Sequence, residues 1–188
     1  MAEGRIDRMS VADARAAGAE HGLPDTLAEL SVFRIALRNP SVAQALHGLL
    51  RNLLWSGRLD GRLRELIIMR IGWSTGSEYE WTQHWRVATG MDIPPDDLLA
   101  VRDWEASDVF GPLERVVLAA ADESLATGKI GDATWARCRE LLADDVLLVE
   151  LVAVIGAWTL FSGLLRTLEV PLEDGVAAWP PDGRSPRP

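Results

Sequence analysis

The sequence predicts an all-α protein of about eight or nine helices. Three observations support this fold class. Apolar residues recur at the three- and four-residue spacing of a helix. Most of these segments begin at a capping residue and end at glycine or proline. No segment alternates apolar and polar residues over the length of a strand.

Two helices are expected before residue 39. Ser10, with Asp13 three residues later, is typical of the start of a helix, and Gly22 and Pro24 end that segment. Asp25 begins the second segment, which ends at Asn39-Pro40 because proline removes a backbone donor and restricts the residue before it.

Four further helices are expected up to residue 104. Each begins with a residue that can cap a helix or occupy its first turn, and three of them end at glycine. Their expected ranges are 42–55 after Ser41, 61–76 after Asp60, 78–90 after Ser77, and a short helix from Pro94-Pro95 to about Trp104.

The last three helices are expected at 112–128, 132–142 and 145–169. Residues 146–165 are almost wholly apolar and are long enough to cross a membrane, which takes about 20 residues. Glu150 lies near the start of this run, and no other segment resembles a membrane span. Because helices that are apolar on all sides also occur in protein cores, we interpret this segment as a central helix buried on most sides.

Composition excludes several function classes. The chain has 188 residues, enough for one domain, and a formal net charge of −9, which argues against nucleic acid or an anionic membrane as the main partner. Its one cysteine, Cys138, excludes an internal disulfide. The first 16 residues lack the apolar stretch of a signal peptide, so a cytoplasmic location is expected.

A single domain is expected over residues 1–173, with N-terminal helices at 10–38 and a core at 39–173. Residues 174–188 are rich in proline, glycine and arginine near their end and are expected to form a loose tail.

The stretch from Gly76 to His84 can be read in two ways. Ser77 and Glu80 have the spacing of a Ser-x-x-Glu capping box, which would explain both without any chemistry. His84 lies one turn after Glu80, so the three side chains share one helix face and could form a site.

Glu65 lies on the helix before this stretch. The turn at residues 74–76 is expected to fold the two helices into an antiparallel hairpin, which brings Glu65 within side-chain reach of His84. A histidine flanked by carboxylates is a plausible proton-transfer unit.

These residues carry a resemblance to a known family. The run RLRELIIMRIGWSTGSEYEWTQHWRVA, residues 62–88, resembles the signature of the carboxymuconolactone decarboxylase superfamily, which includes the alkyl hydroperoxidase D-like (AhpD-like) proteins. Redox members have Glu, eleven intervening residues, Cys-x-x-Cys, three residues and His. Glu65, Ser77, Glu80 and His84 occupy these positions, and the similarity extends over about residues 39–173. The resemblance implies an AhpD-like helical bundle.

The departure from the family pattern bears on function. Ser77 and Glu80 stand where the two cysteines would be, and Cys138 lies on a different predicted helix. Thiol peroxidase activity is therefore not expected. The decarboxylase branch implies instead a cofactor-independent lyase or isomerase that acts on a small oxygenated or carboxylated substrate.

For such an enzyme we expect His84, Glu80 and Glu65 to be catalytic and four further residues to contact substrate: Ser77, Trp81, Trp85 and Arg86. No metal site or cofactor is expected, since no second histidine stands at ligand spacing. The alternative is a non-catalytic small-molecule binding or assembly module on the same fold.

A homo-oligomer is expected because the helices at 41–55 and 146–165 carry more apolar surface than one thin α-layer can bury. The resemblance implies a trimer or hexamer, with a dimer as the smaller alternative.

Overall fold

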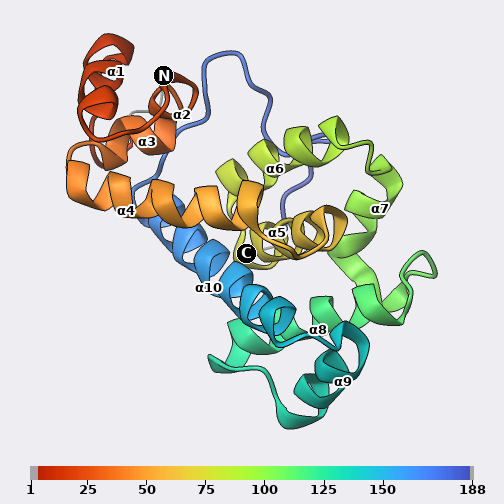
Figure 1. Ribbon diagram of the computed structural model, residues 1–188. Coiled ribbons are helices and arrows are strands. Elements are labelled where there is room, and N and C mark those ends of the chain that lie inside the picture. The colour runs from red at the N-terminus through yellow and green to blue at the C-terminus, as the bar shows by residue number, and fades with distance from the viewer. Residues whose placement is uncertain (1–3, 187–188) are drawn as a thin grey trace. The chain divides into compact units, whose positions relative to one another are not determined.

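The computed structural model describes residues 4–186, which form ten α-helices and no strand within that range (Figure 1). The all-α prediction is confirmed. The helices are α1 (Val11–Glu20), α2 (Asp25–Ala28), α3 (Ser31–Ala36), α4 (Pro40–Arg51), α5 (Gly61–Thr75), α6 (Glu78–Gly90), α7 (Pro95–Ala100), α8 (Pro112–Thr127), α9 (Asp132–Leu142) and α10 (Asp145–Thr167). A π-helical turn, Asn52–Ser56, follows α4, and a 3₁₀ segment, Val101–Ala106, follows α7.

The described residues form two compact units. The first comprises residues 4–56 and 163–176, and the second comprises residues 57–162 and 177–186. All residues expected to form the site belong to the second unit.

In the first unit, the single helix expected at 26–38 is two helices. α2 ends at Ala28 and α3 begins at Ser31, because Leu30 has an extended backbone conformation that interrupts the helix. The next helix, α4, begins two residues earlier than expected. Its cap is Asn39, whose side chain accepts a hydrogen bond from the Val42 amide, and not Ser41.

In the second unit, α5 and α6 form an antiparallel hairpin (Figure 1). Gly76 ends α5 with a φ of 70°, a left-handed conformation that favours glycine, and the Ser77 amide donates to the Gly72 carbonyl. A Cβ at Gly72 would lie 3.2 Å from the Trp81 amide nitrogen, so glycine there allows the close approach of the two helices. The sharp turn fixes which residues of α5 and α6 face each other.

The core of the second unit is rich in tryptophan. Trp81 has no exposed surface and packs with Trp85, and the Trp73 ring lies 5.3 Å from that of Trp81. Other members of this cluster come from α5, α7, α8 and the segments between them: Leu66, Met69, Leu98, Val101, Phe110 and Leu118.

Helix α10 is long and apolar enough to cross a membrane by length and composition alone, with 44% of its most apolar window buried. Leu151, Val154 and Trp158 are buried, whereas Val149 is 69% exposed. The helix is therefore less buried than expected and leaves an apolar face exposed.

Residues 177–186 are anchored to the second unit, in contrast to the loose tail expected from 174. Trp179 is buried, and the Trp81 indole donates to the Pro180 carbonyl at 2.8 Å. Asp182 forms a two-bonded ion pair with Arg102, whose guanidinium also lies over the ring of Trp81.

Candidate functional site

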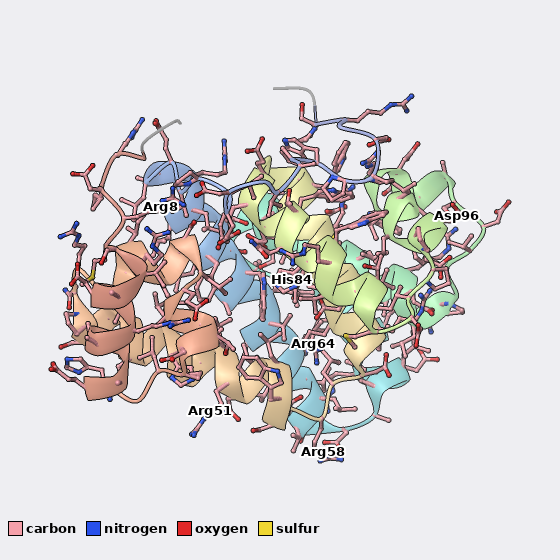
Figure 2. All side chains as sticks on the ribbon, turned by 90° about the horizontal axis from the view of Figure 1, so that it is seen from above. Arg8, Arg51, Arg58, Arg64, His84 and Asp96 are labelled. Carbon is pink, nitrogen blue, oxygen red and sulfur yellow. The ribbon has the colours of Figure 1, made fainter. Side chains whose placement is uncertain are left out.

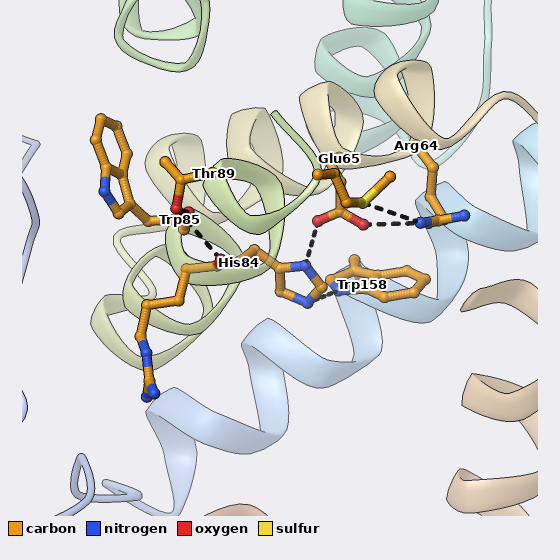
Figure 3. A network of polar contacts seen from close by, with 8 residues as sticks. Arg64, Glu65, His84, Trp85, Thr89 and Trp158 are labelled. Carbon is orange, nitrogen blue, oxygen red and sulfur yellow. Dashed lines mark hydrogen bonds and ion pairs between the residues drawn. The ribbon is translucent and has the colours of Figure 1, made fainter. Parts of the chain in front are cut away.

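Glu65 is a fully buried carboxylate on α5. Its Oε1 atom accepts a hydrogen bond from Nε of Arg64 at 3.1 Å, and its Oε2 atom lies 2.7 Å from Nδ1 of His84 (Figure 3). Burial alone would raise the pKa of Glu65, but its contacts with His84 and then those with Arg64 lower it below the ordinary value. Glu65 is therefore ionised at neutral pH and accepts from both neighbours.

His84 on α6 lies between Glu65 and Trp158 of α10. The Trp158 indole nitrogen donates to Nε2 of His84 at 3.0 Å, and the two rings meet edge to face with centroids 5.5 Å apart (Figure 3). Figure 2 shows His84 on the side of α6 that faces α10. With a side chain 14% exposed, His84 is the partly accessible member of this chain of contacts.

Glu80 does not join the contact between Glu65 and His84. It lies one turn before His84 on α6, and its Oε2 atom accepts a short hydrogen bond from the Ser162 hydroxyl of α10. Burial raises the pKa of Glu80 well above its ordinary value, and the bond from Ser162 opposes this only in part. Burial therefore favours the protonated form of Glu80, and its buried Oε1 atom has no hydrogen-bond partner in the structure.

The two contacts between α6 and α10 have matched spacing. Glu80 and His84 are four residues apart on α6, and their partners Ser162 and Trp158 are four apart on α10 in the opposite order. Because residues four apart lie on the same helix face, the two helices run antiparallel here and are joined at two successive turns.

The expected capping box is not formed. Ser77 occupies the residue before α6, but its side chain accepts no capping hydrogen bond, and the Glu80 carboxyl contacts Ser162. The Ser77 hydroxyl is fully buried without a hydrogen-bond partner. Two unpartnered buried polar atoms therefore lie three residues apart at the start of α6: the Ser77 hydroxyl and Oε1 of Glu80.

The two tryptophans expected to contact substrate lie in the hydrophobic core. Trp81 and Trp85 belong to the hydrophobic cluster with Leu66 and Met69, and the ring that contacts His84 is that of Trp158. Arg86 is exposed on α6, where the structure gives it no contact with Glu65 or His84.

Cys138 is a buried free thiol on α9. Burial, and then the charge of Glu123, raises the pKa of this thiol to about 11, so almost none of it is the reactive thiolate at neutral pH. Within residues 4–186, no group of three or more His, Cys, Asp or Glu side chains is arranged to hold a metal ion.

Trp158, Ser162 and Arg64 were not predicted from the sequence. Trp158 and Ser162 carry side-chain donors on a mostly apolar helix, and their four-residue spacing matches that of Glu80 and His84. This match is a signal that could have identified them. Arg64 could have been found as the only basic residue adjacent to Glu65 in the chain.

Part of the chain matches a known protein family. Residues 40–123, which include Glu65, Ser77, Glu80 and His84, match the carboxymuconolactone decarboxylase family. No curated protein matches the chain.

Several solved structures share the fold. An uncharacterised peroxidase-related protein with an AhpD core from Ralstonia eutropha JMP134 is 18% identical, with a TM-score of 0.74, covering 93% of this chain and 94% of that one. The debrominase Bmp8 is 18% identical, with a TM-score of 0.71, covering 89% and 91%. A peroxidase-related protein from Silicibacter sp. TM1040 is 14% identical, with a TM-score of 0.69, covering 88% and 85%. At these identities the likeness establishes the AhpD-like fold.

Proposed function

Because residues 40–123 match the carboxymuconolactone decarboxylase family and the chain has a single cysteine, we propose that it is an enzyme that uses acid–base chemistry on a small oxygenated or carboxylated substrate. The observation that carries the proposal is the 2.7 Å contact between Nδ1 of His84 and the buried carboxylate of Glu65. A carboxylate in this position orients an imidazole and stabilises its charged form, which is what a general base requires.

The proposed step is a proton transfer at carbon. Nε2 of His84 takes a proton from a carbon next to a carbonyl group, and the electron pair of that C–H bond moves onto the carbonyl oxygen. The neutral carboxyl of Glu80 donates a hydrogen bond to this oxygen, which stabilises the charge that develops there. Return of the proton to the same or a neighbouring carbon restores His84 and gives exchange or isomerisation.

Glu80 suits the acid role for two reasons. Burial favours its protonated form, and it lies on the same face of α6 as His84, one turn away. Its Oε2 atom is paired with the Ser162 hydroxyl and its Oε1 atom has no partner, so a proton on Oε1 would be available to a substrate oxygen.

A thiol mechanism has no support in this chain. Ser77 and Glu80 cannot attack a peroxide or resolve a sulfenic acid, and the single cysteine is buried with its pKa raised to about 11. On the same fold, a variant of Bmp8 was solved in complex with 2,3,4-tribromopyrrole, so a small planar ring is a reasonable member of the substrate panel below.

The second candidate is a non-catalytic binding or assembly module. One observation favours it: both ring nitrogens of His84 contact protein groups, and Glu65 is also paired with Arg64. Such a histidine can be wholly structural. The two candidates differ in whether a bound small molecule exchanges protons with solvent.

The test is hydrogen exchange in heavy water. Native protein, His84→Gln and Cys138→Ser are each incubated in D₂O with a panel of small ketones, lactones, unsaturated carboxylic acids and pyrroles, and deuterium uptake is followed by mass spectrometry. The proposal predicts catalysed uptake by at least one compound with native protein and with Cys138→Ser, and loss of it with His84→Gln. Ligands that raise the melting temperature without exchange support the binding module. Peroxide reduction that disappears in Cys138→Ser contradicts both candidates.

A further inference from the structure

The contact between Trp158 and His84 fixes the protonation state of the imidazole. An indole N–H can only donate a hydrogen bond, so the Nε2 atom that accepts it, at 3.0 Å, must carry a lone pair and no proton. The remaining ring proton therefore resides on Nδ1, where it is donated to Oε2 of Glu65. Figure 3 shows the three groups in this order. His84 is thus held as one neutral tautomer.

The same contact blocks the atom that the proposed reaction needs. If Nε2 took up a proton while Trp158 stayed in place, two N–H donors would face each other at hydrogen-bond distance. Proton uptake at Nε2 therefore requires that the indole move away, and a substrate that approaches Nε2 must displace it.

Trp158 is well placed to control whether a substrate reaches Nε2 of His84. It is 1% exposed, so its indole N–H has no alternative partner in bulk solvent. One turn further along α10, Ser162 holds Glu80, so a movement of α10 that freed His84 would also alter the contact of the acid. The charged or titratable groups around His84 are Glu65 and Arg64 from α5 and Glu80 from α6.

We propose that Trp158 is a positioning residue that keeps Nε2 of His84 unprotonated and covers it until a ligand displaces the indole. Its part in catalysis rests on the proposed function, whereas its effect on Nε2 does not. A neutral small molecule with a weakly acidic C–H or N–H group fits this arrangement best, because it replaces the indole as the donor to Nε2. An anionic group directed at Nε2 would instead place a hydrogen-bond acceptor against an atom that is itself an acceptor.

The first test is a nitrogen-15 NMR spectrum of protein labelled in its histidine rings, recorded without any ligand. Native protein is expected to show His84 with Nδ1 protonated and Nε2 unprotonated. Trp158→Phe removes the donor to Nε2 while Glu65 still accepts from Nδ1, so a population of the ring protonated on both nitrogens is then expected. Trp135→Phe, which removes an indole from α9, is the control and should leave the His84 signals unchanged.

The second test is the rate at which diethyl pyrocarbonate modifies each histidine, read by peptide mass spectrometry. Because one hydrogen bond no longer protects Nε2, modification of His84 should become several-fold and at most about tenfold faster in Trp158→Phe. His21 and His47, the only other histidines, serve as internal references in every sample.

A third variant separates the hydrogen bond from packing. Benzothienylalanine at position 158 keeps the shape of the indole and replaces its N–H with sulfur, so it tests the proposal even if Trp158→Phe does not fold. The proposal is overturned if native His84 has its proton on Nε2, or if the protonation of Nε2 and the modification rate are unchanged by loss of the N–H. These results are independent of deuterium exchange, so either proposal can fail alone.

Discussion

The Nδ1 atom of His84 lies 2.7 Å from the Oε2 atom of Glu65, and the two residues come from adjacent antiparallel helices. This contact follows from the chain itself. A two-residue turn at Gly76 and Ser77 sets the register of α5 and α6, and a register set by so short a turn brings residues 65 and 84 to the same level. A substitution that changes this register is therefore expected to affect the site before it affects the core.

The buried acid Glu80 makes stability depend on pH. Its pKa is higher in the folded protein than in the unfolded chain, so the folded state retains a proton that the unfolded state releases above about pH 4.5. Glu80 thus favours the folded state at low pH, and this contribution is lost as the pH rises from that value toward the folded pKa, by at most about 1.4 kcal/mol per pH unit. Glu80→Gln should remove this part of the slope in urea unfolding measured from pH 5 to pH 9.

Ser162→Ala is the matched control for that experiment. It keeps the carboxyl but removes the hydrogen bond that lowers the pKa of Glu80, so the loss of stability should extend to higher pH than in native protein. Parallel stability curves for native protein and Glu80→Gln would show that Glu80 ionises alike in both states, contrary to this account.

The stability of Ser77→Ala shows whether the Ser77 side chain caps α6. A capping serine would cost roughly 0.5–2 kcal/mol on replacement by alanine. In the structure the Ser77 hydroxyl is buried and makes no hydrogen bond, so its removal should leave the free energy of unfolding unchanged or raise it. Thermal unfolding of the variant measures this directly, with Asp60→Ala, which removes a formed cap on α5, as the destabilised reference. A loss of stability for Ser77→Ala equal to that for Asp60→Ala would mean that the Ser77 side chain does cap α6, contrary to the structure.

Much of the fold was predictable from the sequence because its signals are local. Caps such as Ser10 and Asp60 act within one turn and form as expected. The contact between Glu65 and His84 could also be predicted from the sequence, since it depends on the one short turn between α5 and α6. Both follow from backbone geometry over a few residues.

The rest of the site depends on packing between distant segments. Trp158 and Ser162 reach α6 only because α10 packs against it, which spacing within one segment cannot reveal. Ser77 was expected to cap α6, but its side chain is buried in the interior. Trp81 and Trp85 were expected beside His84, yet burial of large aromatic surface placed them in the core.

The exposed apolar face of α10 leads to a prediction about assembly. Val149 is 69% exposed, and Val146, Val152 and Leu160 are each about half exposed. Covering such a row removes apolar surface from water, so we expect a homo-oligomer, a trimer or hexamer by family resemblance or a dimer. Sedimentation at micromolar concentration should show the oligomer for native protein and a smaller species for Val149→Glu. If native protein sediments as a monomer, the prediction of a homo-oligomer is wrong.

The claim that His84 is the general base is tested most directly by comparing the rate of deuterium uptake with native protein and with His84→Gln. With the first panel compound that exchanges, the rate of deuterium uptake is measured for native protein and for His84→Gln, with circular dichroism and sedimentation to verify the same fold and assembly. A positioned general base contributes about 10²–10⁴-fold, so His84→Gln should be slower by that factor while remaining folded. Equal rates in the two folded proteins would contradict the assignment of His84 as the base.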